Sequence, residues 1–146
     1  MENSLVKQLS VFLENREGRL EEVLDILAKH QVNIVALSLA DTEDYGMLRM
    51  IVSDPETGKK ALKEAGITSM LTEVVALRVP HATGSLAKAI HRLVDNQINI
   101  EYMYAFANGG DAAAVMKSDH PQKAVSVLQE GGFTVYQAGE AYKANQ

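Results

Sequence analysis

The fold is decided by a stretch that occurs twice in the chain: residues 18–34 read GRLEEVLDILAKHQVNI, and residues 84–100 read GSLAKAIHRLVDNQINI. The second copy follows the first at an offset of 66 residues and aligns with it without a gap. Further identities follow at the same offset, in the pairs Met50/Met116, Pro55/Pro121, Leu62/Leu128, Glu64/Glu130, Gly66/Gly132 and Thr68/Thr134. Most of these are turn or core positions, where identity has structural meaning. The sequence therefore predicts a duplicated unit, with one domain at residues 1–70 and a second at residues 71–146.

Each copy begins with the pattern of a strand followed by a helix. Leu9, Val11 and Leu13 alternate with Gln8, Ser10 and Phe12, the period of two that is typical of a strand. Apolar residues then recur at helical spacing, at Leu20, Val23, Leu24 and Leu27. The second copy repeats both patterns.

The rest of each copy indicates a strand hairpin, a second helix and a fourth strand. Asp54-Pro55 and His120-Pro121 start the second helices, since proline is tolerated in a first helical turn. Fourth strands start at Ile67 and Phe133, and the first of these runs into the next copy near residues 69–74. The order strand, helix, strand, strand, helix, strand predicts an α+β fold of two ferredoxin-like βαββαβ units side by side, each with helices on one face of an antiparallel sheet.

Composition excludes several classes of function. The net charge of −5 and the pI near 5.3 argue against a nucleic-acid partner, which needs a basic surface. No apolar run is long enough to span a membrane, and the first residues do not resemble a signal peptide. The absence of cysteine removes disulfides and thiolate chemistry. We expect a cytoplasmic, non-redox protein.

Candidates for catalysis are few. The four histidines are scattered without a metal-binding spacing, and no phosphate-binding loop or nucleophile elbow is present. The acidic run from Asp41 resembles the start of a calcium loop, but Val52 stands where such a loop needs a bidentate Glu. We expect no enzyme activity, no catalytic residue, no metal and no cofactor.

The loop between the first strand and the first helix, Glu14–Leu20, is the best candidate for a binding site. A helix N-terminus presents unsatisfied N–H groups that suit a carboxylate, and Gly18 lets the backbone approach a ligand closely. Asn15 can both donate and accept hydrogen bonds, which suits a group carrying an amine and a carboxylate. The alternative is that Asn15 caps the helix and Gly18 turns the chain.

Asn33 and Asn99 open the second strand of each copy, although asparagine is a poor strand former. They are either turn residues between helix and strand, or polar groups that face the loop of a neighbouring domain.

The loop Glu14–Leu20, the strand start Val32-Asn33-Ile34 and the repeated βαββαβ order resemble ACT domains, regulatory modules that bind amino acids. The family's loop commonly has proline where this chain has Glu17. Serine-binding members carry histidine where this chain has Leu13, which argues against serine as the ligand. The second loop departs further, with His81 in the place of Asn15.

The resemblance implies that ligands bind between the strand–helix loop of one unit and the second strand of its neighbour. One site would then join the first loop with the second strand of the second copy. The other site would join the second loop with the second strand of the first copy. The implied residues are Asn15, Arg16, Glu17, Gly18, Arg19 and Leu20 with Asn99, Ile100 and Glu101, and His81, Thr83, Gly84, Ser85 and Leu86 with Asn33, Ile34 and Val35.

The expected function is that of a sensor with a free amino acid as its effector, bound at the seam between two ACT-like domains. The alternative is a regulatory subunit or interaction module that docks on a metabolic enzyme without a ligand of its own. Residues 34–40 of the first copy are fairly apolar on both faces of the predicted strand, and Ile100, Tyr102, Tyr104 and Phe106 lie on one face in the second copy. Because a strand that is apolar on both sides usually has both sides covered, we also expect a homodimer.

Overall fold

The computed structural model describes residues 3–41 and 44–145. It contains two compact units. We call Lys7–Thr72 the first unit, and Met1–Val6 together with Glu73–Gln146 the second unit. This division differs from the predicted one because Leu5 is buried in the hydrophobic core of the second unit, with its side chain among residues of the C-terminal half.

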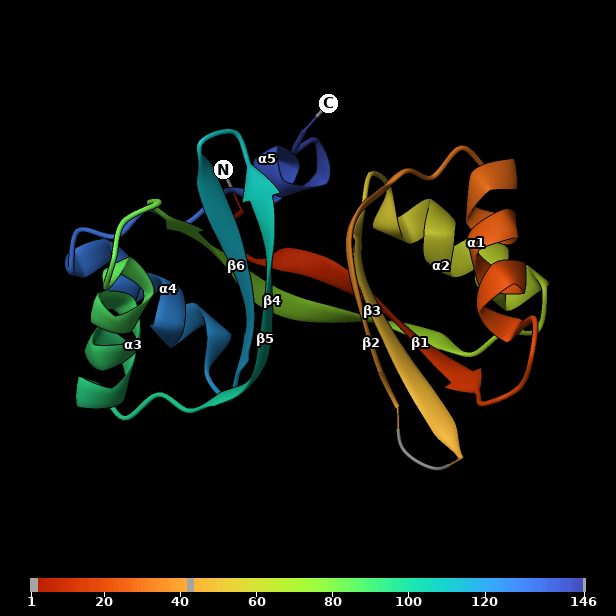
Figure 1. Ribbon diagram of the computed structural model, residues 1–146, viewed down its shortest axis with the longest axis horizontal. Helices are drawn as coiled ribbons and strands as arrows, with labels where there is room; N and C mark the ends of the chain where they lie inside the picture. The colour runs from red at the N-terminus through yellow and green to blue at the C-terminus, as the bar shows by residue number, and fades with distance from the viewer. Residues whose placement is uncertain (1–2, 42–43, 146) are drawn as a thin grey trace. The chain divides into compact units, whose positions relative to one another are not determined.

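The first unit has the predicted βαββα order and ends in the first residues of a fourth strand. In Figure 1 both of its helices lie on the same face of its sheet. β1 pairs antiparallel with β3, and β3 pairs antiparallel with β2, so β2 is the outer strand of this unit. The elements are β1 (Val6–Glu14), α1 (Arg19–Lys29), β2 (Ile34–Asp41), β3 (Tyr45–Val52), α2 (Pro55–Glu64) and the start of β4 (Ser69–Val79).

The core of the first unit follows from the two predicted periodicities. The apolar residues of β1 alternate toward α1, where Val23 and Leu27 are fully buried. On the opposite face of β1 the polar residues Gln8 and Ser10 are also buried, and the Gln8 side-chain amide donates to the Ser10 hydroxyl over 2.9 Å. A buried polar group is expected to have such a partner, because leaving it unpaired costs free energy.

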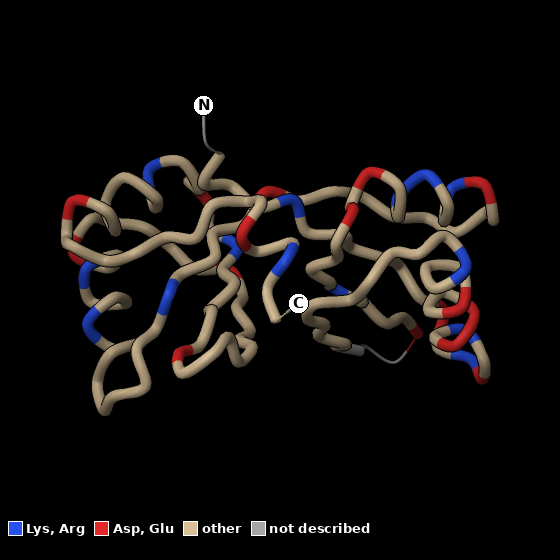
Figure 2. Tube along the Cα trace, turned by 90° about the horizontal axis from the view of Figure 1, so that it is seen from above, with Lys and Arg blue, Asp and Glu red and all other residues tan. Residues whose placement is uncertain are grey.

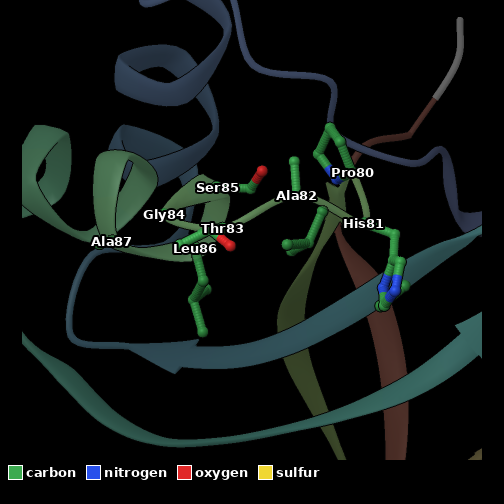
Figure 3. Close-up of a pocket in the computed structure, with 10 residues that line it drawn as sticks. Pro80, His81, Ala82, Thr83, Gly84, Ser85, Leu86 and Ala87 are labelled. Atoms are coloured by element: carbon green, nitrogen blue, oxygen red, sulfur yellow. The ribbon is translucent and has the colours of Figure 1, made fainter.

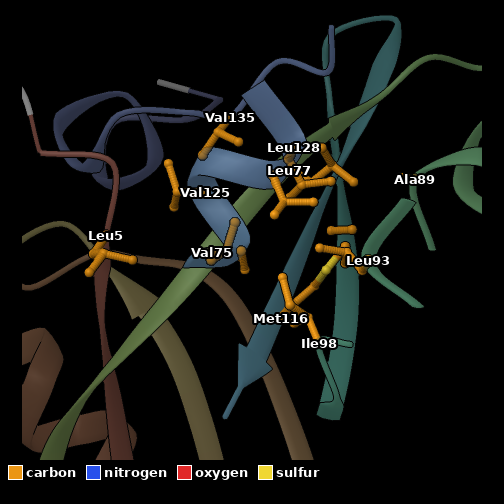
Figure 4. Packing of buried hydrophobic residues seen from close by; sticks show 13 residues of the cluster. Leu5, Val75, Leu77, Ala89, Leu93, Ile98, Met116, Val125, Leu128 and Val135 are labelled. Atoms are coloured by element: carbon orange, nitrogen blue, oxygen red, sulfur yellow. The ribbon is translucent and has the colours of Figure 1, made fainter. Parts of the chain in front are cut away.

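The second unit repeats this arrangement. In its part of the sheet β4 pairs antiparallel with β6, and β6 with β5. Figure 4 shows its core, in which Leu77 of β4 and Met116 of β6 lie near Leu93 and Leu128 of the helices. The additional elements are α3 (Ser85–Asp95), β5 (Ile100–Asn108), β6 (Asp111–Ser118), α4 (Pro121–Glu130) and α5 (Ala138–Tyr142).

The predictions of a fourth strand in each copy had different outcomes. The prediction that the fourth strand of the first copy continues into the second copy is confirmed, because β4 is a single strand. The prediction of a full strand from Phe133 is wrong. Val135 forms only an isolated bridge with Leu77, and the short helix α5 begins soon afterwards. The Gln137 N–H donates to the Glu140 carboxylate over 3.0 Å, which favours a helix start over a longer strand.

The duplication is visible in the backbone angles. Gly66 and Gly132 follow the second helix of each copy with φ of +78° and +85°, as predicted for glycine beyond a helix C-terminus. Gln31 and Gln97 share the unusual φ values of 59° and 57°. The α+β fold of two ferredoxin-like units is therefore confirmed down to these local conformations.

Candidate functional site

The loop between β1 and α1 has a defined backbone conformation. The N–H of Arg16 donates to the carbonyl of Glu14 over 2.8 Å, and the N–H of Arg19 to the carbonyl of Arg16 over 3.3 Å. Gly18 occupies the N-cap position with φ +83°, in the left-handed region that favours glycine, and has no side chain that could cap the helix. The predicted turn at Gly18 is therefore confirmed, whereas a cap by Asn15 stays a prediction.

A cavity of about 280 Å³, which we call the first-unit cavity, lies beside this loop. It is bounded by the loop, the start of α1, the outer strand β2 and the start of β3. Its lining residues are Leu13, Glu14, Asn15, Arg16, Arg19, Leu20, Leu39 and Gly46.

Arg19 is the most enclosed charged side chain of this cavity, with only 16% of its side chain exposed. Its Nη1 donates to the carboxylate of Glu22 over 2.9 Å. Its Nε is buried and has no hydrogen-bond partner among residues 3–41 and 44–145. By contrast, Arg16 is 60% exposed and pairs with Glu14 over 3.4 Å.

The loop between β4 and α3 has the same backbone conformation. The N–H of Ala82 donates to the carbonyl of Pro80 over 2.8 Å, and the N–H of Ser85 to the carbonyl of Ala82 over 3.2 Å. Gly84 is the N-cap of α3 with φ +85°, again without a side-chain cap. The two loops thus keep one geometry although their side chains differ.

A larger cavity of about 630 Å³, the second-unit cavity, lies beside this second loop. Figure 3 shows Leu86 directed from the start of α3 toward the strands, with the hydroxyl groups of Thr83 and Ser85 in the loop. Its lining residues are Val79, Pro80, His81, Ala82, Thr83, Gly84, Ser85, Leu86, Ala87 and Ala112.

Most of the predicted loop residues line one of the two cavities. Glu17 and Gly18 belong to the first loop but do not line its cavity, whereas all five predicted residues of the second loop line theirs. Outside the two loops, sequence reasoning missed Leu13, Val79, Ala87, Leu39, Gly46 and Ala112. The signal for the last two was available, because Gly46 and Ala112 are separated by the same 66 positions as the loops.

The predicted residues of the second strands make contacts within their own units. The Asn33 N–H donates to the Ser53 hydroxyl over 2.8 Å, and the Asn99 N–H donates to the Asp119 carboxylate over 3.2 Å. These bonds involve the backbone of both asparagines, so the two interpretations of their side chains stay open.

The other second-strand residues have local partners as well. Ile34 and Ile100 pack against the cores of their own units, and Glu101 forms an ion pair with Lys117 over 3.1 Å. Val35 lies at the irregularity where the pairing of β2 with β3 shifts. The combination of each loop with the second strand of the other unit stays a prediction.

Other site classes find little support in the described part of the chain. No group of three or more His, Cys, Asp or Glu side chains there is placed to hold a metal ion. None of its helices combines the length and apolar character needed to cross a membrane. Basic residues are interspersed with acidic ones along the trace in Figure 2.

Comparison with known proteins identifies the fold family. A family model described as an ACT domain pair matches residues 4–139. The chain is similar to the crystal structure of protein BT0572 from Bacteroides thetaiotaomicron, with 42% identity, a TM-score of 0.92, and coverage of 96% of this chain and 97% of that one.

More distant structures share the fold. The ligand-free regulatory subunit of aspartate kinase from Thermus thermophilus has 12% identity and a TM-score of 0.64, with coverage of 89% of this chain and 94% of that one. The aspartate kinase regulatory subunit from Thermus flavus has 13% identity and a TM-score of 0.58, with coverage of 90% and 97%. No match is found among curated proteins. The length of the match and the two repeated units agree: this chain belongs to the family of ACT domain pairs.

Proposed function

We propose that this protein is a regulatory, non-enzymatic module that binds a free amino acid at its strand–helix loops. The observation that carries the proposal is the pair of loops with one shared backbone geometry, each opening onto a cavity at the start of a helix. The cavities, more than the shared glycine conformation, support binding, because paired left-handed glycines also occur at Gly66 and Gly132 beyond helix C-termini.

The helix starts supply the chemistry for a carboxylate. The first N–H groups of a helix have no acceptor within the helix, and the helix dipole places partial positive charge at the same end. The N-cap residues of α1 and α3 are both glycine, so neither has a side chain of its own to cap these groups. A ligand carboxylate can therefore accept hydrogen bonds there, as anions do at other helix N-termini.

The amine of the ligand needs an acceptor at the mouth of the loop. Asn15 in the first loop and His81 in the second occupy the corresponding place and line the two cavities. We further propose that the second strand of another ACT unit closes each site, with Asn99, Ile100 and Glu101 facing the first loop and Asn33 to Val35 facing the second.

The family supports a regulatory role. Two of the structures with the same fold are regulatory subunits of aspartate kinase, an enzyme of metabolism. We propose by analogy that this protein acts on a metabolic enzyme in the cytoplasm, with the amino acid as the signal.

A homodimer is part of the same proposal. Leu37 and Leu39 lie on the outer strand β2 and are 49% and 48% exposed. Exposed leucines on an outer strand favour cover by another chain, because an uncovered apolar edge is a site of unwanted association. Sedimentation or light scattering would test this: a monomer at micromolar concentration contradicts it.

A thermal-shift screen of the twenty amino acids tests the central proposal. A ligand that binds only the folded protein stabilises it by RT ln(1 + [L]/Kd), or about 2.7 kcal/mol at a hundredfold excess over Kd. We expect a rise of several degrees for at least one amino acid. No shift at tens of millimolar would count against amino-acid binding.

Matched glycine variants show whether the shift comes from the loops. Gly18, Gly84, Gly66 and Gly132 all have positive φ, and a Cβ at each would meet no atom within 4 Å. The pair Gly18→Ala/Gly84→Ala and the pair Gly66→Ala/Gly132→Ala therefore introduce similar backbone strain. We expect the ligand-induced shift to be lost in the loop pair and retained in the other pair.

A further inference from the structure

The two cavities occupy corresponding places in the two units but differ in charge and size. The offset of 66 residues that relates the loops also relates Arg19 to Ser85, Leu39 to Ala105 and Gly46 to Ala112. Because the backbone is the same at both loops, a difference in ligand must come from the lining side chains, which also differ at Asn15/His81 and Arg16/Ala82.

Arg19 gives the first-unit cavity an enclosed positive charge. Its side chain is 16% exposed, and Glu22 takes only its Nη1. The buried Nε has no acceptor in the described part of the chain. A guanidinium carries five N–H donors and no acceptor, and its fork matches the two oxygens of a carboxylate.

The other charges near this cavity are paired. Glu14 and Arg16 also line it, but both are more than half exposed and pair with each other over 3.4 Å. Glu22 balances the charge of Arg19, so the attraction for a ligand comes from the guanidinium N–H groups that Glu22 does not take. A second ligand carboxylate, beyond the one at the helix start, can accept from these groups.

The second-unit cavity has no comparable charge. Its lining contains no Asp, Glu, Lys or Arg, and Ser85 stands where the first unit has Arg19. Apolar side chains such as Val79 and Leu86 line it beside the hydroxyls of Thr83 and Ser85. An additional ligand charge would be desolvated there without a partner, which is costly.

The cavities also differ in size, at about 280 Å³ in the first unit and about 630 Å³ in the second. Leu39 lines the first-unit cavity, and its Cδ1 is 3.3 Å from the position that a Cβ on Gly46 would take. In the second unit the same two places hold Ala105 and Ala112, of which Ala112 lines the cavity and Ala105 does not. No side chain as large as that of Leu39 therefore lines the second-unit cavity from the corresponding strand, β5.

We propose that the two units bind different classes of amino acid: a short acidic one, aspartate or glutamate, in the first-unit cavity through Arg19, and a bulkier uncharged one in the second-unit cavity. This inference rests on the proposed function. It makes the protein a sensor of two signals, with Arg19/Ser85 and Leu39/Ala105 as the residues that decide specificity.

Calorimetric titration of the full chain with aspartate, glutamate, leucine and phenylalanine tests the inference. We expect one acidic and one uncharged ligand to bind, each at one site per chain. In Arg19→Ser the acidic ligand should bind about tenfold to a hundredfold more weakly, the range for loss of a hydrogen bond to a charged group. The uncharged ligand should keep its affinity.

Three further variants sharpen the test. Lys29→Ser removes an exposed cation from the last turn of α1, which lines neither cavity, and should leave both affinities within about twofold. Arg19→Lys keeps the charge without the fork and should recover part of the acidic affinity. Ser85→Arg/Ala105→Leu should convert the second unit into a second acidic site, so that the stoichiometry for the acid rises to two per chain.

The possible failures are distinguishable. If no amino acid binds, the proposed function fails and the inference with it. If amino acids bind but Arg19→Ser weakens aspartate and leucine equally, or weakens neither, the inference is overturned while the proposed function stands. Circular dichroism of each variant identifies any that has lost its fold, and Arg19→Lys then decides the outcome for the first unit.

Discussion

In the first unit Phe12 meets Tyr45 edge-on, with ring centroids 6.5 Å apart, whereas the corresponding place in the second unit holds an ion pair between Arg78 and Asp111. Both pairs join the same two strands of their units, and all four side chains are at least partly exposed. The strand pairing therefore does not depend on the chemistry of this contact. The two units share the buried apolar residues of their helices and strands and the left-handed glycines. Their exposed positions differ.

The largest effect is expected where the units are most alike. Leu27 and Leu93 occupy corresponding places on α1 and α3 and are 0% and 1% exposed. Leu27→Ala and Leu93→Ala should each lower the free energy of unfolding by about 2–5 kcal/mol, through lost burial and the cavity left behind. Urea denaturation measures both. A loss below 1 kcal/mol at either site would mean that the two cores are not equivalent.

The loop glycines should come next. Alanine in the left-handed region costs about 1–2 kcal/mol, so Gly18→Ala and Gly84→Ala should destabilise the unliganded protein equally within this range. Neither new Cβ would meet another atom within 4 Å, so the loss of stability should come from the backbone strain alone. Thermal unfolding without ligand checks this, and unequal losses would break the equivalence of the loops.

Substitutions at the starts of the second helices should cost less stability, and the cost should differ between the two units. Asp54 caps α2 by accepting hydrogen bonds from Thr57, over 2.7 Å from the hydroxyl and 3.2 Å from the backbone N–H, whereas His120 at the start of α4 caps nothing in the described residues. Asp54→Ala should cost about 1 kcal/mol, and His120→Ala much less. Equal losses in chemical denaturation would contradict the assignment of the cap.

The cap should also depend on pH. Two hydrogen bonds lower the pKa of Asp54 below its ordinary value. The bond from the Thr57 hydroxyl has the larger effect and the bond from the Thr57 N–H the smaller. A lowered pKa in the folded state means that the stabilisation is complete above the unfolded pKa, about 3.9, and is lost as the pH falls through the folded pKa. The difference in stability between wild type and Asp54→Ala should therefore shrink below pH 4, as measured by denaturation across pH.

The smallest losses of stability are expected for the two cross-strand pairs. The Arg78–Asp111 contact is an exposed ion pair, so Arg78→Ala should lower the stability only slightly at low salt and less at high salt. Phe12→Ala should cost about 0.5–1.5 kcal/mol with no dependence on salt, because an edge-on aromatic contact involves no net charge. Denaturation at two ionic strengths separates the two, and a salt-dependent loss for Phe12→Ala would contradict this explanation.

The sequence predicted the fold because its strongest signals are local and doubled. Apolar periodicity fixed the buried stripes of α1 and α3, and glycines at a constant offset fixed where the helices begin and end. It did not predict the bridge at Val135 in place of a strand, because that outcome depends on the helix start at Gln137. Nor did it predict that Leu5 belongs to the second unit, because that contact joins residues far apart in the chain.

The candidate site was predictable in its loops and not in its walls. The loop residues could be recognised from their glycines and from the repeat, whereas nothing in the sequence distinguishes Leu39 from other apolar strand residues. Its place beside Gly46 follows from the register of β2 against β3, which the sequence alone leaves open. Arg19 was visible in the loop, but its enclosure became evident only from the packed helix start.

The position of Leu5 in the second core bears on how the chain folds during synthesis. The first unit lies within one continuous stretch, Lys7–Thr72, and can form as soon as that stretch has been made. The core of the second unit joins Leu5 with residues as far along as Val135, so it cannot be completed until nearly the whole chain has left the ribosome. Nascent chains should therefore acquire structure in two steps. A truncation that removes Leu5 should weaken the half made last.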